Sequence, residues 1–154
     1  RSRLLKPLQH HVCLVAIASK ATTSNTIGIS YTVAGTVEMT VRSPFAKRGD
    51  RYNGSHHHSR QYPYLSNLAV HSNYRRQGVA RQLLESCDAT ALSWGFHDLY
   101  LHVLANNHAA KQLYFNFGYQ LHSVDTSLSA WLMGRPQQLL LHKHLGGCNT
   151  LNPS

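Results

Sequence analysis

The residues best suited to chemistry form a short segment rich in arginine, placed between an expected strand and an expected helix. Arg75, Arg76 and Arg81 surround Gly78, and the first acidic residue after them is Glu85. A helix N-terminus carries about half a positive charge and favours acidic neighbours, so this first turn has the opposite of the usual charge. Because free backbone N–H groups at a helix start bind phosphate well, the segment predicts a phosphate site rather than a plain turn.

Two better-known phosphate motifs do not fit this segment. A Walker loop requires Gly-Lys-Ser/Thr after a four-residue gap, and a dinucleotide fingerprint requires Gly-x-Gly-x-x-Gly. Neither spacing occurs around Gly78. The predicted ligand is therefore a phosphate-bearing group held by backbone amides and arginine side chains.

Hydrophobic patterning predicts the elements that position this segment. Residues 64–70 are mostly aromatic, aliphatic or β-branched, which is typical of a strand. From Val79 onward apolar residues recur at helical spacing, and Gly95 after Trp94 is a suitable helix stop. Further strands are predicted over residues 12–19, 27–41 (with a bend or bulge at Ala34-Gly35), 98–104, 119–124 and 137–144, and a second helix over 108–117.

Composition indicates one basic globular domain. The chain has 154 residues, 42% of them hydrophobic, with fifteen Lys and Arg against six acidic residues and a net charge of +9. Such a charge predicts an anionic ligand or partner. No apolar run approaches the roughly 18 residues of a membrane-spanning helix, so no membrane partner is expected. The three cysteines lack ligand spacing and predict free thiols in a reducing compartment.

The chain divides into a basic N-terminal remnant (1–11), one domain (12–145) and a flexible tail (146–154). Residues 43–61 form a long basic loop within the domain. This loop carries three successive histidines, 56–58, but real zinc sites bring ligands together from fixed elements. A surface loop is therefore predicted, and no metal is expected.

The order of motifs resembles that of the GNAT superfamily of acyl-CoA-dependent N-acetyltransferases. The residues within the motifs are most similar to those of its cyanobacterial and plastid branch. The resemblance covers about residues 12–144. It implies an α/β fold with a mixed, mostly antiparallel central sheet flanked by helices. It also implies a strand and two helices ahead of Val12, which are expected to be missing here. The matching motifs are Asn67-Leu68-Ala69-Val70, Arg75-x-x-Gly78-x-Ala80, Asn106-Asn107, Leu113-Tyr114 and Gly118-Tyr119.

The resemblance implies a site for acetyl-CoA as co-substrate. Backbone amides of residues 76–81 would hold the pyrophosphate, the strand edge at 68–70 would bond the pantetheine arm, and Asn107 would contact the cofactor near the mouth of the site. Asn106 and Asn107 also supply a helix cap. The implied cofactor-binding residues are Leu68, Ala69, Val70, Arg75, Arg76, Gln77, Gly78, Val79, Ala80, Arg81 and Asn107.

The resemblance also assigns the catalytic candidates. Tyr114 would be the general acid that protonates the departing thiolate. His102 replaces a glutamate that serves as base in bacterial ribosomal-protein acetyltransferases, and histidine gains and loses a proton near neutral pH. Glu38, on the polar face of its strand, is the reserve base. Without the resemblance, each of these residues would be given an ordinary structural role: Tyr114 as a core aromatic, His102 as a structural histidine and Glu38 as a solvated glutamate.

The expected reaction is direct attack of a primary amine on acetyl-CoA, with a protein α-amine or lysine as the acceptor. A non-catalytic acyl-CoA-binding module and a small-molecule amine acetyltransferase are the alternatives. Nucleic acid is a less expected partner, because the chain has no aromatic–basic interleaving and no recognition-helix pattern. The expected location is the cytoplasm, with the plastid stroma as the alternative.

Overall fold

The computed structural model describes residues 10–22, 28–43, 61–124 and 136–146. Several predicted features lie outside these residues. They are the N-terminal remnant up to residue 9, most of the basic loop with its three histidines (44–60), the segment 125–135, and the tail from residue 147 with Cys148.

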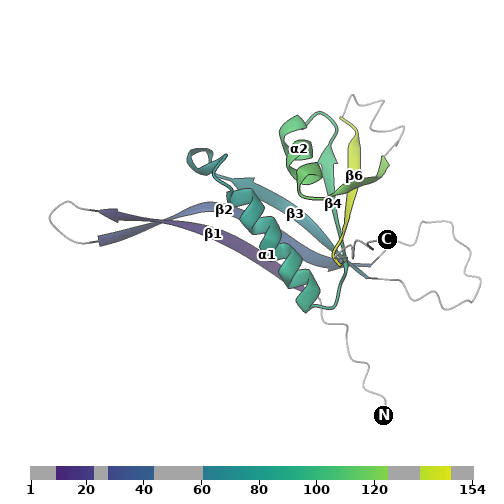
Figure 1. Ribbon diagram of the computed structural model, residues 1–154, viewed down its shortest axis with the longest axis horizontal. Coiled ribbons are helices and arrows are strands. Elements are labelled where there is room, and N and C mark those ends of the chain that lie inside the picture. The colour runs from purple at the N-terminus through teal and green to yellow at the C-terminus, as the bar shows by residue number, and fades with distance from the viewer. Residues whose placement is uncertain (1–9, 23–27, 44–60, 125–135, 147–154) are drawn as a thin grey trace, which may run out of the picture.

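The fold is built on one six-stranded sheet (Figure 1). Its strands are β1 (His11–Thr22), β2 (Gly28–Arg42), β3 (Tyr62–Val70), β4 (Asp98–Leu104), β5 (Gln120–Val124) and β6 (Gln138–His144). The strand order is β1-β2-β3-β4-β6-β5, and β3 with β4 is the one parallel pair among them. This arrangement confirms the expected mixed, mostly antiparallel sheet.

The bend expected in the second strand is present as a bulge. Ala16 pairs with Gly35 and Ile17 pairs with Val33, so Ala34 is an extra residue on β2. The other predicted strands are all found, with ends that shift by up to three residues. β3 begins earlier than expected and includes Pro63, which pairs with Val41.

The helices are η1 (Ser72–Tyr74), α1 (Val79–Ser93) and α2 (His108–Asn116). Side chains of α1 and α2 pack into the same core, so both lie on one face of the sheet. None of the described helices is long and apolar enough to cross a membrane. The buried core is formed by Val37, Met39, Leu65, Leu83, Leu84, Cys87, Ala91, Leu99, Leu101, Val103, Tyr119, Leu141 and Leu145.

Gly35 allows α1 to approach β2 closely. A Cβ atom at this position would lie 2.8 Å from the carbonyl oxygen of Ala69, 3.1 Å from a Val79 methyl carbon and 3.2 Å from a Leu83 methyl carbon. Because interiors are close-packed, even one added methyl group would push the helix away from the sheet. The first turns of α1 therefore lie directly on β2 and β3.

A mostly buried ion pair joins β6 to α1. Lys143 Nζ lies 2.5 Å from Asp88 Oδ2, with 16% and 19% of the two side chains exposed. The same ammonium lies 3.8 Å from the centroid of the Phe117 ring at the end of α2. Burial raises the pKa of Asp88, while the hydrogen bond and charge of Lys143 oppose that rise. Lys143 thus connects β6 with both helices.

Substituting Lys143→Met should lower the free energy of unfolding by about 3 kcal/mol at neutral pH, because it leaves a buried carboxylate unpaired. The folded-state pKa of Asp88 then rises further above its unfolded value, so the native state binds the extra proton and stability falls as pH rises. The deficit should therefore shrink on acidification toward the ordinary aspartate pKa of 3.8. Urea unfolding at several pH values measures it.

The double variant Asp88→Asn/Lys143→Met is the control for this ion pair. It removes both charges, so it should recover much of the stability that the single variant loses. A single-variant deficit that is the same at every pH would contradict an electrostatic cause.

Candidate active site

The central feature of the site is the divergence of β3 and β4. Their parallel pairing is confined to Tyr64 with Tyr100 and Leu65 with Leu101. Beyond these pairs the two strands separate, and Figure 1 shows β3 running toward η1 while β4 runs toward α2. Residues 66–70 of β3 therefore present a backbone edge toward β4 that no described strand occupies.

A second bulge lies where the strands part. Thr36 pairs with Ala69 and Glu38 pairs with Ser66, so β3 has one residue more than β2 between these pairs. Asn67 adopts a left-handed conformation there, with φ of 53°, and its amide donates to Glu38 Oε2 at 2.9 Å. Bulges bend a strand and increase its twist, which explains why β3 turns away from β4 at this point.

The predicted phosphate segment connects η1 to α1 and has its backbone groups available. Gly78 is the N-cap residue of α1, with φ of 82° and no side-chain cap. The first N–H groups of a helix have no partner within it. Arg76 is also left-handed, with φ of 62°. A Cβ atom on Gly78 would meet nothing within 4 Å, so the space beside the amides is open.

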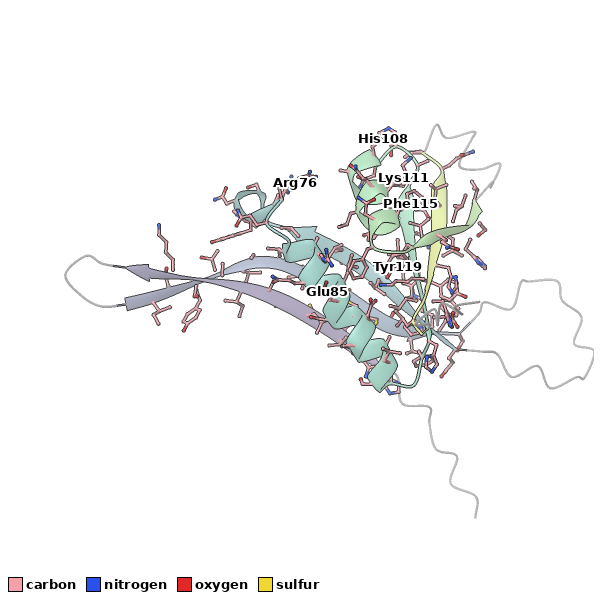
Figure 2. All side chains as sticks on the ribbon, viewed as in Figure 1. Arg76, Glu85, His108, Lys111, Phe115 and Tyr119 are labelled. Carbon is pink, nitrogen blue, oxygen red and sulfur yellow. The ribbon has the colours of Figure 1, made fainter. Side chains whose placement is uncertain are left out.

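The arginines around this turn have different partners. Arg75 Nε donates to the carbonyl oxygen of Val70 at 3.1 Å, which ties the turn to the end of β3. Arg81 pairs with Glu85 along the exposed side of α1. Within the described part of the chain, the Arg76 side chain has no hydrogen-bond or ion-pair partner. Figure 2 shows Arg76 on the turn before α1, across from His108 and Lys111 on α2.

Tyr114 projects from α2 into the core beside the diverging strands. Its ring lies 5.7 Å from that of Tyr119. Burial raises the pKa of Tyr114 above its ordinary value, and the nearby Tyr64 and Cys87 add to the rise. The hydroxyl therefore stays protonated at physiological pH, as a proton donor requires.

His102, a predicted catalytic residue, pairs with Tyr64, which the sequence did not predict as part of the site. The Tyr64 hydroxyl and His102 Nδ1 are 2.8 Å apart, which joins β3 to β4 beside their parallel pairing. Tyr64 contributes to the raised pKa of Tyr114. Leu65 and Leu101 face the core against which Tyr114 packs, so Tyr64 and His102 lie on the opposite face of the sheet. Tyr64 was missed because the strand pattern indicates its face but not which residue of β4 lies beside it.

Two other candidates have structural partners. Glu38 lies on the polar face as expected, but its carboxylate accepts the hydrogen bond from Asn67. The side-chain oxygen of Asn107 accepts from the backbone N–H of Ala110 at 3.1 Å, which confirms the expected helix cap. The structure does not connect Glu38 or Asn107 to Tyr114 by any described hydrogen bond.

Neither described cysteine is placed as a nucleophile. Cys87 is a fully buried residue of α1, and burial raises the pKa of its thiol to about 12. Cys13 is exposed on β1, two strands away from β3. No group of three or more His, Cys, Asp or Glu residues that could hold a metal ion occurs in the described ranges.

Comparison with known families decides the assignment. Residues 10–119 match the acetyltransferase (GNAT) family. The chain belongs to this family. Its matched region contains β1 to β4, both α-helices and the phosphate segment.

Curated relatives include N-acetyltransferases from the plant Arabidopsis thaliana. The chain is 38% identical over 78 residues to the chloroplastic GCN5-related N-acetyltransferase 7, covering 51% of this chain and 28% of that protein. It is 31% identical over 137 residues to the chloroplastic GCN5-related N-acetyltransferase 10, covering 89% of this chain and 50% of that protein. The chain thus spans half or less of the length of these relatives.

Solved GNAT structures share the fold at low sequence identity. Arabidopsis thaliana Naa50 in complex with the bisubstrate analogue CoA-Ac-MVNAL is 19% identical, with a TM-score of 0.54 and coverage of 73% of this chain and 66% of that one. A putative streptothricin acetyltransferase from Bacillus anthracis, in complex with acetyl coenzyme A, is 15% identical, with a TM-score of 0.53 and coverage of 88% and 89%. At these identities the likeness concerns the fold alone.

The residues of this GNAT chain fit an acyl-CoA. The open space at Gly78 and the unpaired amides of the first α1 turn suit a pyrophosphate. The unoccupied edge of β3 suits an extended arm with amide groups. The end of that edge lies near Tyr64, whose hydroxyl bonds His102.

Proposed function

We propose that this chain transfers an acetyl group from acetyl-CoA to a primary amine of a protein or peptide, either an α-amine or a lysine. The observation that carries the proposal is the unoccupied edge of β3. It runs between the open turn at Gly78 and the point where Tyr64 bonds His102, and Tyr114 packs against the core on the other face of the sheet. In this proposal the pyrophosphate would bind at the turn, the arm would extend along β3, and the reacting end would lie near these side chains.

The cofactor half of the site would be held mainly by backbone groups. Acetyl-CoA would supply the acetyl group as a thioester that an amine can attack. The amides at the start of α1 and the Arg76 guanidinium would bind the pyrophosphate. Leu68, Ala69 and Val70 would bond the arm as an additional strand, and an N–H there would face the developing oxyanion.

Tyr114 would act as general acid. Its hydroxyl is kept neutral by burial, so a proton is available for the sulfur as it leaves. A buried phenol is a suitable donor only when it is positioned beside the acceptor atom. Since the described cysteines are not placed as nucleophiles, direct attack by the amine is the simplest course.

Tyr64 and His102 would act together as the base. The Tyr64 hydroxyl would take the proton from the attacking amine, directly or through water, while its own proton passes to His102 Nδ1 across the 2.8 Å hydrogen bond. Glu38 would hold the bulge by binding Asn67, which keeps β3 turned away from β4, and it remains the reserve base.

The proposed acceptor class and the proposed cellular location are inferred from the related proteins. The Naa50 complex holds an analogue with the sequence MVNAL, which favours a peptide α-amine over a small amine. The streptothricin acetyltransferase keeps a small-molecule acceptor as the second candidate. The chloroplastic names of the Arabidopsis relatives favour the plastid stroma over the cytoplasm.

The test of the proposed function is a transfer assay on the purified chain. Acetyl-CoA is supplied with a panel of peptides that carry a free α-amine, a lysine or neither, and with small polyamines. Mass spectrometry locates each added acetyl group. Thioester hydrolysis or CoA binding without any acetylated amine would overturn the proposal in favour of an acyl-CoA-binding module.

His102→Ala should lower kcat/KM by about 100-fold near neutral pH, the lower end of the range for acid–base catalysis. The loss should be largest below about pH 8, where amines are mainly protonated. It should be smaller for α-amines, whose pKa is about 7.7–8.0, than for lysine, whose pKa is about 10.4. Initial rates across the pH range with matched α-amine and lysine peptides measure this.

Tyr64→Phe is the companion variant, because it keeps the ring and removes only the hydroxyl that bonds His102. If the two groups act as one relay, the double variant should be no slower than His102→Ala alone. Equal losses at every pH and for both acceptors would indicate that His102 has a packing role.

A further inference from the structure

Arg42, the last residue of β2, has an unusual position for a surface arginine. Its guanidinium carbon lies 3.5 Å from the centroid of the Tyr64 ring, and the residue is half-buried. The hydroxyl of the same tyrosine bonds His102. A stable positive charge is therefore held against the ring of the residue proposed to receive the amine proton.

No carboxylate of the described residues pairs with Arg42. By the period of two along a strand, Glu38 and Asp98 lie on the same face of the sheet as Arg42. Glu38 accepts from Asn67, and Asp98 Oδ1 accepts from both His142 and His144 at 2.8 Å and 3.0 Å. These two acids on the same face are thus engaged with other partners.

We propose that Arg42 is a specificity residue that binds a carboxylate of the amine acceptor. The proposal rests on the proposed function and names the acceptor class of that site: peptides with an acidic side chain close to the reacting amine. Stacking on Tyr64 orients the planar guanidinium, so its N–H edges can bind a carboxylate in a fixed geometry. The same positive charge disfavours the ammonium form of a nearby amine, which helps the attack.

The test compares two peptides that differ only in Glu or Gln as the second residue. Wild-type protein should have a kcat/KM about tenfold higher for the Glu peptide, the ratio expected from one hydrogen bond to a charged group. Arg42→Met, whose unbranched side chain still covers the Tyr64 ring, should bring the ratio close to one. Lys20→Met removes one charge from the exposed end of β1 and should leave the ratio as in wild type.

Two further measurements separate the possible outcomes. Calorimetric binding of both peptides to the CoA-loaded protein needs no turnover. If neither peptide is acetylated but the Glu peptide binds more tightly in an Arg42-dependent way, the transferase assignment fails and the acidic preference stands. The wild-type ratio should also fall as salt is added, because screening weakens ion pairs, and this result requires no variant to fold. Equal wild-type binding and turnover of the two peptides, or an unchanged ratio in Arg42→Met, would overturn the inference.

Discussion

Tyr114→Phe should lower kcat by roughly 10²-fold to 10⁴-fold, the usual contribution of a positioned acid or base, while the affinity for CoA stays unchanged. The substitution keeps the ring that packs 5.7 Å from the ring of Tyr119 and removes only the hydroxyl. Burial already keeps this hydroxyl protonated, so its loss removes a donor and no charge. Steady-state kinetics for turnover and calorimetry for CoA binding measure the two effects separately.

Tyr119→Phe is the matched control for this prediction. Tyr119 is 2% exposed, and its hydroxyl has no hydrogen-bond partner among the described residues. Removing an unsatisfied buried hydroxyl costs little stability, so this variant should fold and turn over like the wild type. If Tyr114→Phe keeps the wild-type kcat as well, the thiolate leaves without help from Tyr114.

Gly78→Glu should abolish measurable CoA binding, a loss of more than about 100-fold. A carboxylate would lie beside the amides that are proposed to hold the pyrophosphate, and like charges in one site repel each other. A Cβ at Gly78 meets nothing within 4 Å, so the first carbon of the new side chain displaces no protein atom. The left-handed φ of 82° adds a backbone cost of about 1–2 kcal/mol.

Gly95→Glu supplies an unusually close control. Gly95 has φ of 83°, a Cβ atom placed on it would meet nothing within 4 Å, and it lies just beyond the other end of α1. It should carry the same backbone cost without affecting CoA binding. Calorimetric titration of CoA into both variants and into Gly78→Ala separates the effect of the added carboxylate from the effect of backbone strain at residue 78. Equal CoA affinities for the Gly78→Glu and Gly95→Glu variants would contradict the phosphate site.

The local parts of this fold could be predicted from the sequence. The strand 98–104 is found with the expected bounds, because its alternation of buried and exposed residues follows one period. Gly78 and Asn107 were recognised at the helix starts, since capping depends on neighbours in the chain. Ala34-Gly35 was identified as a bend or bulge, because small residues interrupt a long β-prone stretch there.

Features that depend on distant residues could not be predicted. A strand pattern gives the face of Tyr64 but not its partner His102, 38 positions later. The extra residue at Asn67 has no local signal, since asparagine is common in turns and the bulge is defined only by its register with β2. The Lys143–Asp88 pair spans 55 positions, and neither residue lies in a motif.

Gly35 would matter if the proposed cofactor site were transplanted into another scaffold. The proposed phosphate turn lies about 40 residues downstream of Gly35, yet its distance from the sheet depends on the absence of a Cβ atom at Gly35. A graft of residues 72–81 onto a sheet with alanine at the equivalent position would raise the first turn of the helix, and its amides would no longer be level with the edge of β3. The transferable unit is therefore discontinuous in sequence: the turn, the strand that precedes it, and one glycine on the neighbouring strand.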